Sequence, residues 1–186
     1  MFTHDAEEAL GWASALVNTM PGTLPGDSST DTLTTLDELT AFFADQPWTG
    51  RFDRDATELE AVRVLRPVLR RFWESDEGEV VRMVNTMLAD AGAVPQIVDH
   101  DSIGWHIHAT PLDAPLADRM AVEFAFAMID VIRADGLDRM RICEADDCDD
   151  VVVDLSKNRS RRYCEGGCAA RAHTSAYRAR QASRVT

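Results

Sequence analysis

The sequence contains no uninterrupted apolar run of about 18 residues, the length that marks a candidate membrane-spanning helix. Its first residues, MFTHDAEEALGW, lack the basic start and apolar stretch of a secretory signal peptide. Internal repeats and low-complexity segments are missing as well. These absences predict a cytoplasmic globular protein with no membrane partner. Because thiols stay reduced in that compartment, the four cysteines indicate metal or redox chemistry before disulfides.

Catalytic motifs are missing too. The chain has no G-x-S-x-G, no glycine-rich phosphate loop and no constellation of carboxylates, so we expect no enzyme. The feature that could argue for an enzyme is the segment WHIHAT. In it, His106 and His108 share one face of a predicted strand at about the spacing of two metal ligands. Asp99 and His100 lie in the preceding turn. A second metal site or a catalytic centre could be built there, but we favour paired imidazoles on a half-exposed hairpin face.

Positive charge is scarce and unevenly placed. The chain has 19 Lys and Arg against 32 Asp and Glu, a formal net charge of −13. Residues 1–156 hold 31 of the acidic and 11 of the basic residues, whereas residues 157–186 hold 8 basic residues and only Glu165. Such asymmetry predicts an anion-binding tail on an acidic body. The alternative is a basic tail that folds back on its own acidic body.

The residues that are present predict a mainly α-helical body with a small β-hairpin. With 45% hydrophobic residues, the chain can bury a core. Apolar residues recur at helical spacing after Thr3 and in segments 33–43, 56–73 and 79–91. Segments 94–98 and 104–110 read as two short strands of a hairpin. The clearest helix follows, with Asp113 as its cap, Pro115 in its first turn and Gly136 as its terminator.

The cysteines form C-x4-C, fifteen intervening residues and then C-x3-C. Two close pairs separated by a hairpin-sized segment suit a tetrahedral zinc site, because each tight turn supplies two ligands. Segments 151–156 and 159–164 would form the hairpin, and Cys168 would begin the last helix. This order predicts a treble-clef-like finger with one structural Zn²⁺ per chain. The four ligands would be Cys143, Cys148, Cys164 and Cys168.

Two other interpretations of the cysteines are weaker. A redox pair is normally C-x-x-C, and the polar neighbours EADD and EGG argue against four unrelated core cysteines. Four thiolates would also leave no open coordination position for catalysis.

Basic residues surround this predicted metal site. On a helix over 168–184, a stripe of alanines is flanked by Arg171 and Arg178 on one side and by Arg180 and Arg184 on the other. The stripe could pack on the finger's hairpin while the basic rims reach phosphates. The alternative is an alanine-rich solvated helix. The predicted nucleic-acid-binding residues are Lys157, Asn158, Arg159, Arg161, Arg162, Arg171, Arg178, Arg180 and Arg184.

The segment RICEADDCDDVVVDLSKNRSRRYCEGGCAARAHTSAYRAR resembles the CGNR-type zinc finger of bacterial proteins regarded as stress-induced transcriptional regulators. The motif residues in register are Asp154, Ser156, Lys157, Asn158, Ser160, Arg161, Arg162, Tyr163 and Cys164. ALVNTMPG at 15–22 and the stretch ending DAPLADRMAVEFAFAMIDVI resemble the ABATE-like domain that precedes this finger. One departure is CAAR in place of CGNR, which leaves the ligands intact but puts the helix's contacts in doubt.

Taken together, the sequence predicts two parts: a helical partner domain at 1–138 and a zinc finger with a basic C-terminal helix at 139–186. The resemblance implies a DNA-binding transcriptional regulator whose first domain senses a small-molecule or protein signal. The alternative is a protein-interaction module, whose finger docks an acidic surface on a partner or on its own body.

Overall fold

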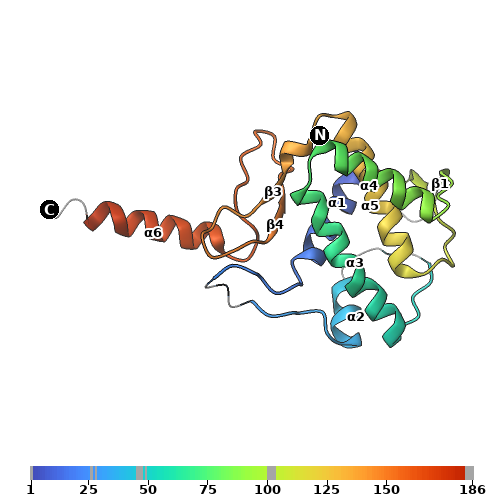
Figure 1. Ribbon diagram of the computed structural model, residues 1–186, viewed down its shortest axis with the longest axis horizontal. Helices are drawn as coiled ribbons and strands as arrows, with labels where there is room; N and C mark the ends of the chain where they lie inside the picture. Colours follow the sequence, from blue (N-terminus) through green and yellow to red (C-terminus); the bar gives the residue numbers. More distant parts are fainter. Residues whose placement is uncertain are drawn as a thin grey trace.

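The structure is a computed structural model that describes residues 2–25, 27, 29–44, 48, 50–99 and 104–182. Four helices precede the first hairpin, one helix follows it, and one ends the described chain (Figure 1). The helices are α1 (His4–Val17), α2 (Leu36–Ala44), α3 (Ala56–Glu74), α4 (Glu77–Asp90), α5 (Leu116–Arg133) and α6 (Cys168–Ala182). The strands are β1 (Gln96–Asp99), β2 (Trp105–His108), β3 (Met140–Ile142) and β4 (Val151–Val153), with a 3-10 turn at Leu137–Arg139. The mainly helical prediction is confirmed.

Helix α5 forms the centre of the helical core. It packs against α1, α3 and α4, and its residues are apolar on most sides, as expected for a helix surrounded by others. The Phe124 ring lies edge-on to Phe72, with centroids 4.9 Å apart, and stacks on Trp73 at 5.9 Å. Aromatic pairs of this kind add to the burial of their area, so they fix α5 against α3.

The predicted cap of α1 is confirmed, whereas the predicted cap of α5 is not. Thr3 caps α1 by accepting a hydrogen bond from the Ala6 N–H. The prediction that Asp113 caps α5 is wrong: Pro115 is the N-cap and makes no side-chain cap bond. At the other end Asp135 takes the left-handed conformation, with φ of 50°. Gly136 follows it, and this position has no room for a side chain, because a Cβ there would lie 2.8 Å from the Phe2 ring.

The first hairpin is confirmed. β1 and β2 pair antiparallel, with Ile97 opposite Ile107 and Val98 opposite His106. Because side chains alternate along a strand, the two faces of this hairpin differ. Ile97 and Trp105 are 71% and 76% exposed, whereas His106 is buried on the other face. His100 lies outside the described residues.

The second hairpin differs from the prediction. β4 pairs antiparallel with β3, so the hairpin encloses the first cysteine pair, and 159–164 is not a strand. The reason is that both edges of β4 are occupied. β3 takes one edge, and at the other the Asn18 amide bonds to both backbone groups of Val151. Segment 159–164 is joined to the finger's hairpin by a backbone bond from the Glu144 N–H to the Arg162 carbonyl.

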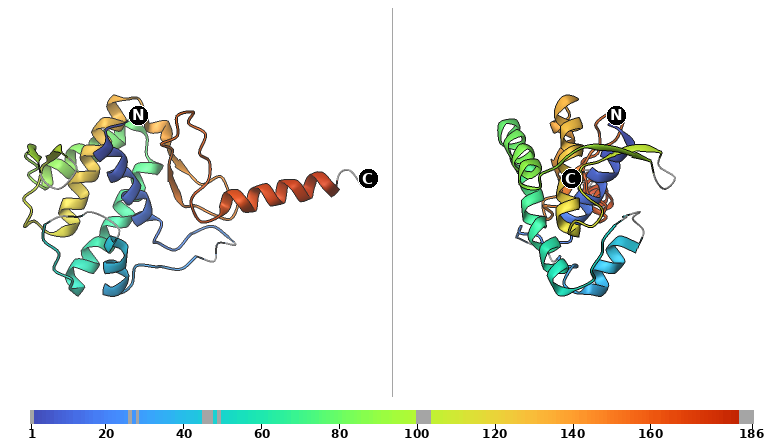
Figure 2. Two further views of the ribbon diagram at one scale, coloured as in Figure 1. Left: turned by 180° about the vertical axis from the view of Figure 1, so that it is seen from behind. Right: turned by 90° about the vertical axis from the view of Figure 1, so that its right-hand side faces the viewer.

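The finger is attached to the helical domain by its hairpin. Met140, Val151 and Val153 are buried in the same apolar cluster as α1, α3 and α5. By contrast, α6 extends away from the rest of the molecule (Figure 1, and Figure 2, left). The division at residues 138 and 139 therefore stays a prediction, with the apolar core crossing it. No helix in the described part of the chain is long and apolar enough to cross a membrane.

Candidate metal centre and nucleic-acid interface

The four cysteine sulfurs form one compact cluster. Their Sγ atoms lie within 4.8 Å of one another, and all four residues are buried. Cys164 Sγ is 3.7 Å from Cys148 Sγ and 3.3 Å from Cys168 Sγ. Four sulfurs bound tetrahedrally to Zn²⁺ at about 2.3 Å would lie about 3.8 Å apart. The cluster therefore has the size and the chemistry to surround one zinc ion.

Local folding brings the two pairs together. Cys143 follows β3 and Cys148 precedes β4, so the hairpin holds the first pair; the Cys143 N–H donates to the Asp150 carbonyl at 2.8 Å. The Cys164 N–H points at Cys143 Sγ, at 3.5 Å. Cys168 begins α6, as predicted, where the positive end of the helix dipole favours a thiolate.

The thiols of the cluster differ in how readily they ionise: burial opposes ionisation of Cys143, but hydrogen bonds from the Cys164 and Ala145 N–H groups lower its pKa, whereas the pKa values of Cys148 and Cys168 are raised. Burial raises the pKa of Cys148 to about 12 and the pKa of Cys168 to about 11. These thiols therefore ionise near neutral pH only when a bound cation stabilises the negative charge. Arg171 contributes positive charge, because its guanidinium donates to Cys168 Sγ at 3.1 Å and to the Gly166 carbonyl at 3.2 Å. Arg171 is the arginine of the CAAR segment, so this part of the motif supports the metal centre. Of the two alanines, Ala169 is half-buried and Ala170 is exposed.

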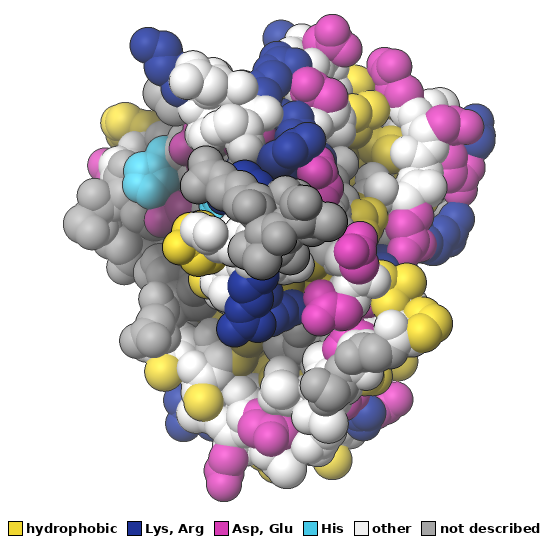
Figure 3. Space-filling view, turned by 90° about the vertical axis from the view of Figure 1, so that its left-hand side faces the viewer, with side chains coloured by type: hydrophobic (Ala, Val, Ile, Leu, Met, Phe, Trp, Pro, Cys, Tyr) yellow, Lys and Arg dark blue, Asp and Glu magenta, His cyan; other side chains and the backbone are white. Residues whose placement is uncertain are grey.

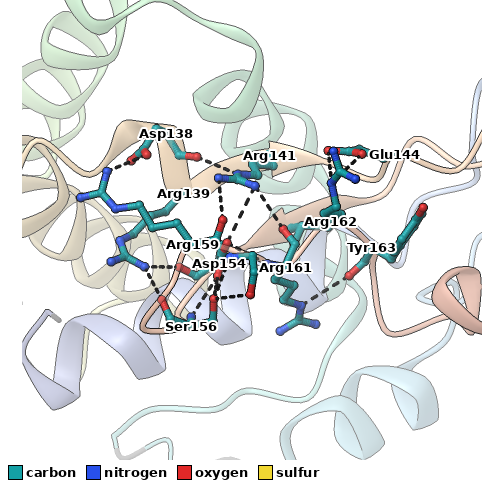
Figure 4. A network of polar contacts seen from close by, with 12 residues as sticks. Asp138, Arg139, Arg141, Glu144, Asp154, Ser156, Arg159, Arg161, Arg162 and Tyr163 are labelled. Carbon is teal, nitrogen blue, oxygen red and sulfur yellow. Dashed lines mark hydrogen bonds and ion pairs between the residues drawn. The ribbon is translucent and has the colours of Figure 1, made fainter.

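A buried carboxylate shapes the loop between the finger's hairpin and the second cysteine pair (Figure 4). Asp154 is completely buried. One of its oxygens accepts from the Ser156 N–H and hydroxyl, and the other accepts from the Arg161 N–H at 2.9 Å. The Ser160 N–H donates to the Ser156 hydroxyl at 3.0 Å. These bonds satisfy backbone groups that a second strand would otherwise pair, which explains why 159–164 forms a loop.

The loop presents predicted nucleic-acid-binding residues to solvent. Lys157, Asn158 and Arg159 are exposed at its tip, and Arg159 adopts a left-handed backbone conformation with φ of 50°. Among the later predicted residues, Arg171, Arg178 and Arg180 are exposed on α6. Arg184 lies outside the described residues. The loop and α6 thus carry the predicted basic residues on two different elements.

All three arginines of the loop, and Arg171 of α6, meet carboxylates of the same chain. Arg159 pairs with Asp138 at 2.6 Å and Arg162 with Glu144 at 3.0 Å. Arg161 pairs with Glu165 in the same way, and Arg171 pairs with Asp147 at 3.3 Å. For Lys157 and Arg178 we find no ion pair with any residue that the structure describes. Seen from the side of α6, Lys and Arg side chains alternate with Asp and Glu across the described surface instead of forming one basic patch (Figure 3).

The alanine stripe of α6 is partly buried at its start and exposed farther along. Ala169 and Ala172 are half-buried near the metal centre, whereas Ala176 is exposed. Tyr177 is 57% exposed. Among the described side chains of α6 after Ala172, Ala176, Arg178 and Arg180 are exposed, which favours the alternative of a solvated helix for this part.

Sequence reasoning missed the residues that connect the finger to the helical domain. The Trp73 indole N–H donates to the Val152 carbonyl at 3.1 Å. Arg70 donates to the carbonyl and carboxylate of Asp149, and the Thr23 hydroxyl donates to the same carboxylate at 2.6 Å. Asn18 makes two more bonds to the finger. The only sequence signal was ALVNTMPG, which contains Asn18 but does not reveal its partner.

The structure also brings His106 and His108 together, as their spacing predicts. Their Nε2 atoms lie 3.0 Å apart, and His108 Nδ1 lies 2.8 Å from a Glu123 oxygen. This cluster lies on the β1–β2 hairpin and α5, within the helical domain and apart from the cysteine centre in the chain.

The fold and the thiol cluster define a zinc-finger protein with a helical partner domain. Residues 139–181 match the CGNR zinc finger, which together with the thiol cluster supports a structural zinc. Residues 11–135 match the ABATE family, described as "Putative stress-induced transcription regulator". That match covers most of the chain, and the protein belongs to this family. A comparison with curated proteins finds no match.

Proposed function

We propose that this protein regulates transcription by binding DNA through its zinc finger, and that the zinc has a structural role only. The proposed ligands are Cys143, Cys148, Cys164 and Cys168, whose sulfurs are mutually within 4.8 Å. With four thiolate ligands, the ion would have no position for water or substrate. Its work would be to hold the hairpin, the loop and the start of α6 in one arrangement.

The observation that carries the proposal is the loop built around Asp154. Its buried carboxylate holds the backbone of Ser156 and Arg161, so that Lys157, Asn158 and Arg159 project from a defined support. Lysine, amide and guanidinium groups are the common donors to phosphate oxygens. The exposed arginines of α6 add a second set, on a helix that extends away from the acidic body (Figure 1).

The ion pairs that Arg159 and Arg162 make with Asp138 and Glu144 are compatible with DNA binding. The side chains of Arg159 and Arg162 are 44% and 62% exposed, and so are accessible while paired. An exposed ion pair is worth about 0–1 kcal/mol, so a phosphate can replace the carboxylate at small cost. We expect Arg159 and Arg162 to exchange Asp138 and Glu144 for DNA phosphates.

The same ion pairs favour a second candidate function. A finger whose arginines already meet carboxylates of its own chain could dock an acidic surface of a protein partner. In that case the zinc would have the same structural role, and DNA would not be the partner. Neither candidate function includes catalysis.

Selecting genomic DNA fragments with the full-length, zinc-loaded protein tests the proposal, and it also yields the sequence that is recognised. We expect enrichment of defined fragments, and loss of binding after removal of zinc with a chelator. Absence of DNA and RNA binding at about 50 mM salt, a condition that strengthens charge effects, would exclude the regulator proposal. The docking candidate then predicts a protein partner that is lost when Arg159 and Arg162 are changed together.

We also propose that the helical domain receives a signal, from a small molecule or a protein, and transmits it to the finger. The bonds of Asn18 and Trp73 to β4, and of Arg70 to Asp149, join α1 and α3 to the metal hairpin. A ligand that shifts α1 against α3 would therefore change the support of the finger. Ligand-dependent DNA affinity, lost on changing Asn18, is the expected result.

A further inference from the structure

Two histidines on β2 face each other through the same ring nitrogen. The Nε2 atoms of His106 and His108 are 3.0 Å apart, and the ring planes are inclined by 76°. The other nitrogen of each ring already has a partner. His106 Nδ1 lies 2.7 Å from the Gly104 carbonyl oxygen, and His108 Nδ1 lies 2.8 Å from Glu123 Oε1.

These partners determine which nitrogen of each ring carries hydrogen. A carbonyl oxygen only accepts, so His106 Nδ1 donates to Gly104. An ionised carboxylate also only accepts, so His108 Nδ1 donates to Glu123. In the neutral imidazoles both Nε2 atoms then carry lone pairs, and these meet across 3.0 Å. That arrangement is stable only when a cation, either a proton or a metal ion, is bound at these two nitrogens.

A metal ion satisfies this geometry. Imidazole nitrogens bind Zn²⁺ at about 2.0–2.1 Å, so two ligands of one ion lie about 2.9–3.4 Å apart for angles between about 90° and 110°. The observed 3.0 Å falls in that range. Metal-binding histidines also donate their second ring N–H to a carbonyl or carboxylate, the role that Gly104 and Glu123 have here.

We propose that His106 and His108 bind a divalent transition-metal ion through their Nε2 atoms, in a site of the helical domain that is separate from the zinc of the finger. Imidazole ligands favour Zn²⁺ and Ni²⁺ over Mg²⁺ or Ca²⁺, which prefer oxygen. With His106 and His108 as the ligands from the described residues, further coordination positions remain for other ligands.

The surroundings give the ion both charge compensation and access. The Glu123 carboxylate accepts a hydrogen bond from His108 Nδ1. Glu123 and the more distant Asp5 favour positive charge at His108, whereas Arg119 disfavours it. His106 is buried, but the His108 side chain is 23% exposed. His108 also lines a pocket of about 520 Å³ together with Gln96 and Thr110. Water and small ligands can therefore reach His108 from this pocket.

A proton is the competing occupant of the same position. With His108 as an imidazolium beside Glu123, its Nε2–H can donate to His106 Nε2 at the observed distance. The metal and this proton exclude each other, because both need the His106 lone pair. The experiment must therefore distinguish a metal site from a hydrogen-bonded histidine pair.

Histidine side-chain NMR of the full chain, with the finger already loaded with one equivalent of Zn²⁺, makes this distinction. On addition of a second equivalent of Zn²⁺, we expect the Nε2 resonances of His106 and His108 to shift together while both Nδ1 atoms stay protonated. Calorimetry should show one further binding event of unit stoichiometry. Unchanged Nε2 resonances at saturating Zn²⁺, or the same with Ni²⁺, would overturn the proposal and leave a proton as the occupant.

Variants assign the site to its residues. His106→Ala or His108→Ala should abolish the second binding event, and Glu123→Gln should weaken it by about 10–100-fold. His4→Ala and Asp118→Asn, which change an exposed histidine and an exposed carboxylate elsewhere, should leave it unchanged. Circular dichroism checks that each variant is folded. A second event that survives both histidine changes in folded protein would contradict the assignment.

Discussion

The side-chain amide of Asn18 bonds to both backbone groups of Val151, a residue 133 positions later in the chain. Its Nδ2 donates to the Val151 carbonyl at 2.9 Å, and its Oδ1 accepts from the Val151 N–H at 2.8 Å. In this way one residue at the end of α1 takes the place of a third strand beside β4. The contact joins the helical domain to the hairpin that holds the first cysteine pair.

Asn18→Ala should loosen the finger from the helical domain. It leaves a donor and an acceptor of Val151 without partners in a part-buried place, at a cost of about 1–3 kcal/mol. We expect a lower free energy of unfolding and faster hydrogen exchange at the Val151 amide. Asn158→Ala, at an exposed loop position, is the matched control and should change neither. Unchanged exchange at Val151 in the Asn18 variant would contradict the role assigned to this amide.

Zinc analysis should give one ion per chain at the four cysteines, beside any ion held by His106 and His108, and Cys164→Ser should lose the cysteine-bound ion. Zinc-finger folding is coupled to metal binding by about 10–16 kcal/mol of apparent binding energy, so the loop and the start of α6 should unfold. The helical signal of α1, α3 and α5 should persist, with a lower melting temperature because Val151 and Val153 belong to their core. Fully folded, zinc-free protein with four titratable thiols is the result that would refute a structural zinc.

Asp154→Asn should damage the loop without removing the metal. Its two oxygens accept three hydrogen bonds from Ser156 and Arg161, and an amide can accept them at only one oxygen. The zinc held by the cysteines should be retained while DNA affinity and stability both decrease. Asp146→Asn, an exposed change between Cys143 and Cys148, should have no effect on either quantity. Loss of zinc in the Asp154 variant would mean that the carboxylate supports the metal centre and not the loop alone.

DNA affinity should fall with salt on a log–log slope of about −3 to −4 if about four phosphates are neutralised, at about −0.9 for each. Lys157→Ala should flatten the slope by about one and weaken all sequences similarly. Arg162→Ala should act in the same direction, although it also releases Glu144. Arg82→Ala, an exposed cation of α4, is the control. A slope that no finger residue alters would place the DNA elsewhere on the protein.

Acid stability should depend on Asp31. Its hydrogen bond with the buried Arg66 lowers the pKa of this carboxyl from 3.8 to about 2. Because the folded-state pKa is the lower one, the contribution is complete above about pH 4 and disappears as the pH falls to about 2. The shift corresponds to about 2 kcal/mol. Asp31→Asn should remove this pH-dependent part of the unfolding free energy, whereas Asp37→Asn, at an exposed position, should not.

Periodicity along the chain predicted most helices correctly. Short-range regularities such as the cap at Thr3 and the apolar spacing of α3 depend on neighbours within one or two turns, which the chain order specifies. The cysteine cluster was predictable for the same reason, because each pair lies within one local turn. The histidine pair follows from alternation on a strand, with both side chains on one face.

Long-range partners could not be predicted in this way. The spacing of residues 151–164 does not indicate that β4 pairs with the preceding strand, β3, instead of with the segment that follows it. Hydrogen bonds from Asn18 and from the Asp154 side chain take the place of pairing with that later segment. Likewise, Arg159 and Arg162 were predicted to reach phosphates, but their carboxylate partners lie 21 and 18 residues away. Sequence alone therefore established that the chain is mainly helical, that the four cysteines group as metal ligands, and that an acidic body is followed by a basic tail. Packing then decided which donors meet which acceptors, because those pairs are selected only when distant segments are buried against one another.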